Sequence, residues 1–286
     1  MPYKAIMERL AEKTRENNVI NDSDYTKNGL LYCGKCNTPK QKEINFMGSI
    51  KKPYCMCSCE TEKHLKEKAL LANNMNYMEI RRLRDEAFPT HQHYSDSKED
   101  MRTWTFANQN GSNPKIMLVA ERYAENFDKC FKEGLGFLFY GNVGAGKSYA
   151  AASIVNAVVE KKYPALMTTF GRIRGEVSDV KLKNAYFDKL NSYALLVVDD
   201  LFAESDGEYM KEITFQVIDE RITNKMPLII TTNLTEEELK SPANIKHQRI
   251  LSRIKKVCRP LLFDGSDQRV KDAFETKSLM KEILGI

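Results

Sequence analysis

The chain has 286 residues, 42% of them hydrophobic, and a formal net charge of +5. This composition is ordinary for a globular protein, and the length accommodates one large domain or one domain with a small appendage. No apolar run reaches about 18 residues, and charges interrupt the first 18, so we expect no membrane span, no signal peptide and a cytoplasmic location. The net charge permits nucleic-acid binding without establishing it.

Three segments occupy the amino-terminal part: a short amphipathic helix, a cysteine-rich segment and a Lys/Glu/Leu-rich helix. Their ranges are 2–18, 33–59 and 61–84. A polar stretch rich in turn-forming residues follows from 88 to 114. We therefore place a domain boundary near residue 95, with an amino-terminal module and linker at 1–95 and a second domain at 96–286.

Five of the seven cysteines lie within the cysteine-rich segment. An odd number of cysteines, five of them close together in the sequence, favours a metal site in a reducing compartment over a disulfide framework. Cys33 and Cys36 have the spacing of one half of a zinc site, and Cys55, Cys57 and Cys59 offer three candidates for the other half. His64 is a less favoured fourth ligand. Because about 30 residues cannot bury enough apolar surface to fold alone, zinc would stabilise this module and would have a structural role.

Apolar strands alternate with helical patterns in the second domain. A helix is predicted at 115–133, and strands are predicted at 136–140, 165–170, 194–199, 227–233 and 260–264. This alternation predicts an α/β fold with a parallel sheet covered on both faces.

A phosphate-binding loop follows the first of these strands. Residues 141–148 match G-x-x-x-x-G-K-[ST], and a helical pattern at 148–160 follows them, which is the context that this motif requires. Lys147 is expected at the β- and γ-phosphates and Ser148 at Mg²⁺; a plain glycine-rich turn is the alternative. The expected nucleotide-binding residues are Gly141, Asn142, Val143, Gly144, Ala145, Gly146, Lys147, Ser148 and Tyr149.

Polar residues end two later strands. Asp199 is the expected Mg²⁺ partner and Asp200 the group that orients the attacking water, with an acidic turn as the alternative. Because aspartate is one methylene shorter than glutamate, we expect slow hydrolysis. Asn233 is expected at the γ-phosphate or the attacking water, with the N-cap of the next helix as an alternative that is compatible with the first role. Arg249 and Arg253 are four residues apart and would share one face of a helix. Their spacing alone does not decide whether they form a solvated basic surface or contact a phosphate.

These motifs, with Val197 to Leu201, Ile229 to Leu234, Arg253 and Arg269, resemble the AAA+ ATPases of bacterial helicase loaders, the DnaC/DnaI group, over about residues 100–270. The cysteine cluster resembles the amino-terminal zinc module of the DnaI-like branch. The resemblance implies a five-stranded sheet of order 5-1-4-3-2. It also implies these residue roles: Lys147 and Ser148 in Walker A, Asp199 and Asp200 in Walker B, Asn233 as sensor 1, Arg253 as arginine finger, Arg269 as sensor 2, and Cys57 and Cys59 as the second zinc pair, with Cys55 a spare or substitute.

The function that the resemblance implies is loading of a hexameric replicative DNA helicase of the DnaB/DnaC type onto single-stranded DNA, with ATP, Mg²⁺ and Zn²⁺ as cofactors. The zinc module would dock the helicase, and AAA+ interfaces would support self-assembly. Most AAA+ proteins carry glutamate where Asp200 stands, so hydrolysis is expected to be slow or partner-dependent. The alternatives are a transposition-helper ATPase of the IstB kind that binds duplex DNA, and an adaptor that binds ATP without hydrolysing it. Basic residues are expected either to follow the backbone of single-stranded DNA, with Phe170 stacking a base, or to be plain solvated surface; they are Arg172, Arg174, Lys255, Lys256 and Arg259.

Overall fold

The computed structural model describes two compact units that divide between Tyr77 and Met78. The described residues are 20–46, 48–89, 100–109, 111–178, 180–202, 207–242, 244–265, 267, 277 and 280–284. The helix expected at 2–18, the boundary expected near residue 95 and the sensor 2 candidate Arg269 lie outside these residues.

The described part of the first unit contains two short antiparallel hairpins. Asn28 and Gly29, with φ of 52° and 75°, form the tight turn of the first hairpin, for which Asn-Gly is a favoured pair. The hairpins are β1 (Tyr25–Lys27) with β2 (Leu30–Tyr32) and β3 (Ile44–Phe46) with β4 (Ser49–Lys51). Helix α2 (Ser58–Ala87) follows, so the helix predicted at 61–84 is present and longer at both ends.

Helices and strands alternate through the second unit. The prediction of a single helix at 115–133 is wrong, because the chain leaves helical geometry at Asn126, whose φ is −100°. The main elements are α3 (Pro114–Glu125), α4 (Phe127–Glu133), β5 (Gly136–Gly141), α5 (Lys147–Glu160), β6 (Ala165–Thr169), α6 (Phe170–Glu176), α7 (Val180–Ser192), β7 (Leu195–Asp199), α8 (Glu208–Thr223), β8 (Leu228–Thr231), α9 (Glu236–Lys240), α10 (Ile245–Val257) and β9 (Cys258–Phe263). Two 3₁₀ turns, η2 (Met101–Thr103) and η3 (Phe106–Asn108), precede them.

The five strands of this unit form one parallel sheet in the order β6-β7-β8-β5-β9. The first strand of this sheet along the chain is β5. If the strands β5 to β9 are numbered 1 to 5 in chain order, their order across the sheet, starting at β9, is 5-1-4-3-2. The strands β5, β8 and β7 are neighbours, and because they are parallel their carboxyl ends meet at one edge.

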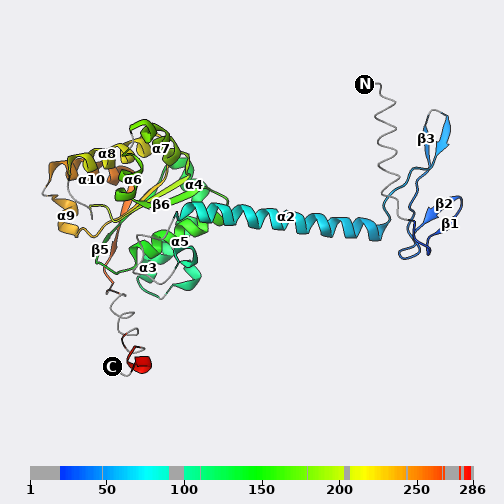
Figure 1. The fold of residues 1–286 in the computed structure, drawn as a ribbon, viewed down its shortest axis with the longest axis horizontal. Helices are drawn as coiled ribbons and strands as arrows, with labels where there is room; N and C mark the ends of the chain where they lie inside the picture. Colours follow the sequence, from blue (N-terminus) through cyan, green and yellow to red (C-terminus); the bar gives the residue numbers. More distant parts are fainter. Residues whose placement is uncertain are drawn as a thin grey trace. The chain divides into compact units, whose positions relative to one another are not determined.

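Helices cover both faces of the sheet (Figure 1). Successive strand residues alternate between two cores: Phe137 and Phe139 join the core that includes α3 and α5, whereas Leu138 joins the core that includes α6, α7, α8 and α10. In β7, Leu195 and Val197 lie in the first core and Leu196 and Val198 in the second. This two-sided burial explains why the strands are continuous apolar runs.

Arg221 is a buried cation that connects the sheet to α8. Its side chain is fully buried, and its guanidinium donates to the carbonyl oxygens of Tyr193 (2.7 Å) and Pro227 (2.5 Å), which precede β7 and β8. It also donates to Leu190 at the end of α7 (3.2 Å). Burial lowers the pKa of Arg221 to about 10. The guanidinium therefore satisfies carbonyl groups at the start of the two strands that lead to Asp199 and Asn233.

Replacing Arg221 with methionine should destabilise the second unit. The substitution leaves several buried carbonyl groups without a donor, so we expect the free energy of unfolding to fall by about 3 kcal/mol. Urea unfolding followed by circular dichroism measures this loss. The matched control is Arg82→Met, because Arg82 is exposed and pairs with Glu86 one turn away; it should change stability by less than about 0.5 kcal/mol. Equal stability of the two variants would contradict the role given to Arg221.

Candidate functional site

The phosphate-binding loop joins β5 to α5, and its three glycines have positive φ. Gly141 (φ 115°) lies against β9, where an added Cβ would fall 2.4 Å from the carbonyl oxygen of Phe263. Gly146 (φ 95°) is the N-cap of α5, and beyond its own neighbours along the chain no described atom lies within 4 Å of where its Cβ would be. The loop therefore ends in an open, side-chain-free cap at a helix N-terminus, which suits a bound anion.

Lys147 lies across this loop. Its side chain is almost fully buried, and its ammonium donates to the carbonyl oxygens of Gly141 (3.0 Å) and Asn142 (2.6 Å). The Lys147 ammonium is therefore held by carbonyl groups at the start of the loop itself. This charge and the amides at the helix start are the donor set that a triphosphate requires.

Ser148 and Asp199 are 51 positions apart in the chain and meet at the end of the sheet. The Ser148 hydroxyl donates to Asp199 Oδ1 at 2.9 Å, and the Thr231 hydroxyl donates to the same oxygen. Asp199 is 1% exposed. Burial, with the charge of Asp200 beside it, raises the pKa of Asp199 to about 6. A hydroxyl and a carboxylate in contact are hard oxygen ligands of the kind that Mg²⁺ prefers.

Asp200 and Asn233 lie next to this pair. Asp200 has a left-handed backbone (φ 56°), its amide donates to Thr231 Oγ1 at 2.9 Å, and its carboxylate accepts from Asn233 Nδ2 at 3.3 Å. The alternative of Asn233 as a helix N-cap is wrong, because Thr235 caps α9 in a reciprocal capping box with Glu238. Asn233 therefore does not cap the helix and instead faces the second carboxylate.

Two residues that support the site were not predicted from the sequence. The Thr231 hydroxyl contacts both Asp199 and the Asp200 amide, and its signal was a hydroxyl residue at the end of a buried strand. Asn113 precedes α3 and donates to the carbonyl oxygen of Ala145 in the phosphate-binding loop at 2.9 Å. No local pattern marked Asn113, because its partner lies 32 positions away.

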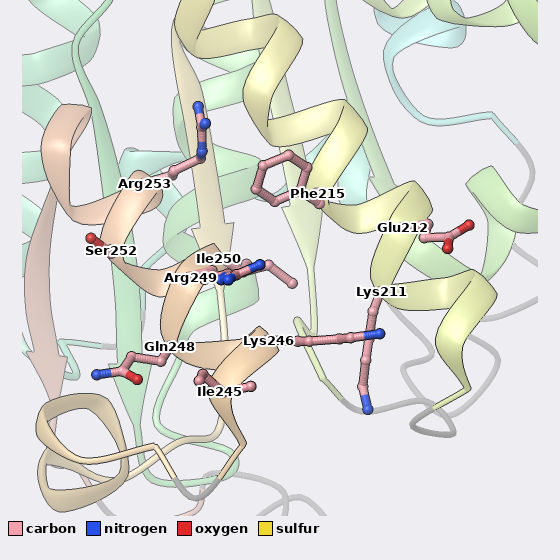
Figure 2. Close-up of a pocket in the computed structure, with 10 residues that line it drawn as sticks. All are labelled: Lys211, Glu212, Phe215, Ile245, Lys246, Gln248, Arg249, Ile250, Ser252 and Arg253. Atoms are coloured by element: carbon pink, nitrogen blue, oxygen red, sulfur yellow. The ribbon is translucent and has the colours of Figure 1, made fainter.

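Arg249 and Arg253 lie on α10 and line one pocket of 910 Å³ between α8 and α10 (Figure 2). Arg253 forms an ion pair with Asp219 of α8, and its guanidinium lies 4.8 Å from the ring centre of Phe215. The two arginines share a helix face, as their spacing predicted. Within the chain, Arg253 is directed toward α8 of its own subunit.

Four cysteines come together in the first unit. The sulfur atoms of Cys33, Cys36, Cys57 and Cys59 all lie within 4.8 Å of one another, and all seven cysteines of the chain are free. Tetrahedral zinc with Zn–S bonds of about 2.3 Å places its sulfurs about 3.8 Å apart, so this group fits zinc. The Thr38 hydroxyl lies 3.0 Å from the Cys36 sulfur and lowers the pKa of that thiol, whereas burial raises the pKa of Cys57.

The two other candidate ligands lie apart from this group. Cys55 does not belong to it, and its thiol lies 3.5 Å from the carbonyl oxygen of Pro39. His64 is exposed on α2. Four thiolates complete a tetrahedral shell, so such a site would be structural.

Among curated proteins, the chain is similar to several that are named replicative helicase loaders. The chain is 26% identical over 188 residues to the replicative helicase loader DnaI of Bacillus subtilis strain 168, which is 60% of each protein. It is 27% identical over 141 residues to the replicative helicase loader DnaC of Escherichia coli K12, or 48% of this chain and 55% of DnaC. The chain thus spans less than two thirds of the length of these relatives. No family model matches it.

The fold is also that of a solved relative. A crystal structure of DnaI superposes with a TM-score of 0.52 and 18% identity, over 65% of this chain and 99% of that one. The expected α/β class with a parallel five-stranded sheet is therefore confirmed, and the chain is DnaC/DnaI-like. Among the described helices, none is long and apolar enough to cross a membrane.

Asp199→Asn should stabilise the protein when magnesium and nucleotide are removed. Burial of the ionised carboxylate opposes folding above its raised pKa, so wild-type stability falls as the pH rises from about 4 to about 6. Asparagine removes the charge and keeps an oxygen for the Ser148 and Thr231 hydroxyls. With a pKa of about 6 for Asp199, the expected gain is up to about 3 kcal/mol at pH 8 and smaller at pH 5.

Urea unfolding in the presence of a chelator measures this gain at both pH values. Asp188→Asn is the matched control, because Asp188 is exposed on α7 and its neutralisation should change stability by less than about 0.5 kcal/mol. A gain for Asp199→Asn that is independent of pH would show that buried charge is not its cause.

Proposed function

We propose that this DnaC/DnaI-like chain is an ATP-dependent loader that binds a hexameric replicative DNA helicase and delivers it onto single-stranded DNA. The observation that carries the nucleotide part is the contact between Ser148 and Asp199, which joins the phosphate-binding loop to the acidic end of β7. The similarity to proteins named replicative helicase loaders supports the rest of the proposal.

The nucleotide would lie at the carboxyl edge of the sheet. Lys147 would offset the charge of the β- and γ-phosphates, with Mg²⁺ held by Ser148 and Asp199. Asp200 would orient the attacking water, and Asn233, 3.3 Å from its carboxylate, would hold it in place. Bound Mg²⁺ would supply neutralisation of the charge that develops on the phosphates. With an aspartate in this role, hydrolysis would be slow and would depend on partners.

A second copy of the chain would complete the site. In this proposal Arg253 leaves Asp219 and reaches the nucleotide of the neighbouring subunit, where a cation stabilises the transferring phosphoryl group. Arg269 would act as sensor 2. Self-assembly would therefore precede efficient turnover.

The amino-terminal module would supply the helicase contact. We propose residues 1–95 for this module with its linker and residues 96–286 for the ATPase domain, with zinc on Cys33, Cys36, Cys57 and Cys59. The fit of four sulfurs to a tetrahedral ion supports the metal. The basic residues of α6 and α10 would follow the phosphate backbone of single-stranded DNA.

A helicase-loading assay tests the function. We expect the full chain to retain the replicative helicase of its own host in a pull-down and to increase helicase assembly on circular single-stranded DNA in the presence of ATP. Lys147→Ala should abolish nucleotide binding and loading, because the loop loses its cation, and should keep the helicase contact. Lys132→Ala, at a lysine in the last turn of α4 away from the loop, is the control. A wild-type chain that retains no helicase and loads none would contradict the proposal.

Arg253→Ala should leave ATP binding nearly unchanged and abolish turnover, because the arginine would act on the neighbour's nucleotide. Mixing it with the Asp199→Asn variant should restore part of the activity through hybrid interfaces. Asp219→Ala is the matched variant: it removes the partner of Arg253 within the subunit and should preserve turnover. Turnover by Arg253→Ala, by its mixture with Asp199→Asn and by Asp219→Ala is measured as phosphate release in the presence of helicase and single-stranded DNA. Normal hydrolysis by Arg253→Ala alone would exclude a shared site.

A further inference from the structure

Lys40 is a buried cation in the first unit, and the nucleotide chemistry does not use it. Its ammonium lies 2.7 Å from Asp24 Oδ2 and 3.1 Å from Glu60 Oε1. The side chains of Lys40 and Asp24 are 0% exposed, and that of Glu60 is 32% exposed. A buried ammonium needs such partners, because removing an unpaired charge from water is costly.

The second oxygen of each carboxylate contacts one of the two cysteine turns. Asp24 Oδ1 accepts from the amide of Gly34, which lies between Cys33 and Cys36, at 3.1 Å. Glu60 Oε2 accepts from the amide of Cys57 at 3.2 Å. A continuous series of hydrogen bonds and ion pairs therefore runs from the first cysteine turn through Lys40 to the second.

The backbone of Lys40 is fixed by the strands around it. Its amide donates to the carbonyl oxygen of Leu31 at 2.7 Å, just before the first cysteine turn. Its own carbonyl oxygen accepts from the amide of Cys55 at 2.7 Å, just before the second turn. The main chain and the side chain of this residue thus each connect the two halves of the cysteine group.

We propose that Lys40 is the positioning residue of the metal site: it sets the separation of the two cysteine pairs through Asp24 and Glu60, and its charge offsets part of the negative charge of four thiolates. This inference rests on the proposed zinc module. Groups that contact the ligands from behind orient them, and their loss typically weakens metal binding by roughly 10- to 100-fold.

A narrower role for Lys40 would be to neutralise Asp24 and nothing more. The two roles differ in what happens when both charges are removed. If Lys40 only neutralises Asp24, the double variant Lys40→Met with Asp24→Asn should bind metal as the wild type does. If Lys40 connects the two cysteine pairs, the double variant should remain weak, because the link through Glu60 is still missing.

The experiment measures metal binding by the full chain. Zinc affinity is obtained by competition with a chromophoric chelator, and the geometry of the site is followed by the absorption bands of Co²⁺ bound to thiolates. We expect Lys40→Met to weaken zinc binding by roughly 10- to 100-fold and to alter the Co²⁺ bands. Lys40→Arg keeps the positive charge and can donate to both Asp24 and Glu60, so it should retain most of the zinc affinity.

Lys52→Met is the matched control. Lys52 belongs to the same unit, pairs with Glu43 at 3.3 Å and donates to the carbonyl oxygen of Gly29 at 2.8 Å, so its partners lie outside both cysteine turns. The variant should bind zinc and Co²⁺ as the wild type does. A Lys40→Met variant with wild-type affinity and bands, or a double variant with full recovery, would overturn the role of Lys40.

Two further outcomes also decide the matter. If Lys40→Met does not fold, Glu60→Gln replaces it as the test, because Glu60 is partly exposed and its neutralisation is milder. Several-fold weaker zinc binding by Glu60→Gln supports the proposal, and unchanged binding overturns it. A wild-type chain that binds neither zinc nor Co²⁺ would refute the metal site itself, a result distinct from a failure of Lys40 alone.

Discussion

Parallel pairing of β5, β8 and β7 is the constraint on which the candidate site depends. Because these neighbouring strands run in the same direction, the phosphate-binding loop, Asp199 and the residues after Thr231 reach one edge of the sheet. The two apolar cores on either face hold that edge in place and bury Asp199 within it. Burial raises the pKa of this carboxyl and so makes its charged form unfavourable for folding, although a bound cation would need that charged form, so stability and chemistry oppose each other at one residue.

The sequence was informative wherever a local pattern is sufficient. Buried parallel strands are continuous apolar runs, and a glycine-rich loop between a strand and a helix is typical of phosphate binding, so the strands and the loop could be predicted. The break at Asn126 could not, because it depends on packing and leaves no proline or glycine as a signal. The ion pair of Arg253 with Asp219 spans 34 positions and exists only once α10 packs on α8. The connections of Lys40 likewise require the folded unit.

The two units are stabilised by different forces. The second unit buries extensive apolar surface on both sides of its sheet, whereas the short strands of the first are largely exposed. A small unit of this kind relies on cross-links in place of a core. In the first unit the buried Lys40 network connects the two cysteine turns, and a metal ion held by the four cysteines would connect the same turns. A substitution in the Lys40 network would therefore also disturb the four-cysteine group, and the reverse.

The resting position of Arg253 affects how an assembly of this chain would respond to protein concentration. The guanidinium is already engaged by a carboxylate and an aromatic ring of its own subunit. Any contact with a neighbour would have to replace those interactions, so the net gain on association is smaller than the new contacts alone would provide. Isolated subunits would then remain apart at low abundance, and a partner that gathers several of them on one surface would raise their effective local concentration and overcome the deficit.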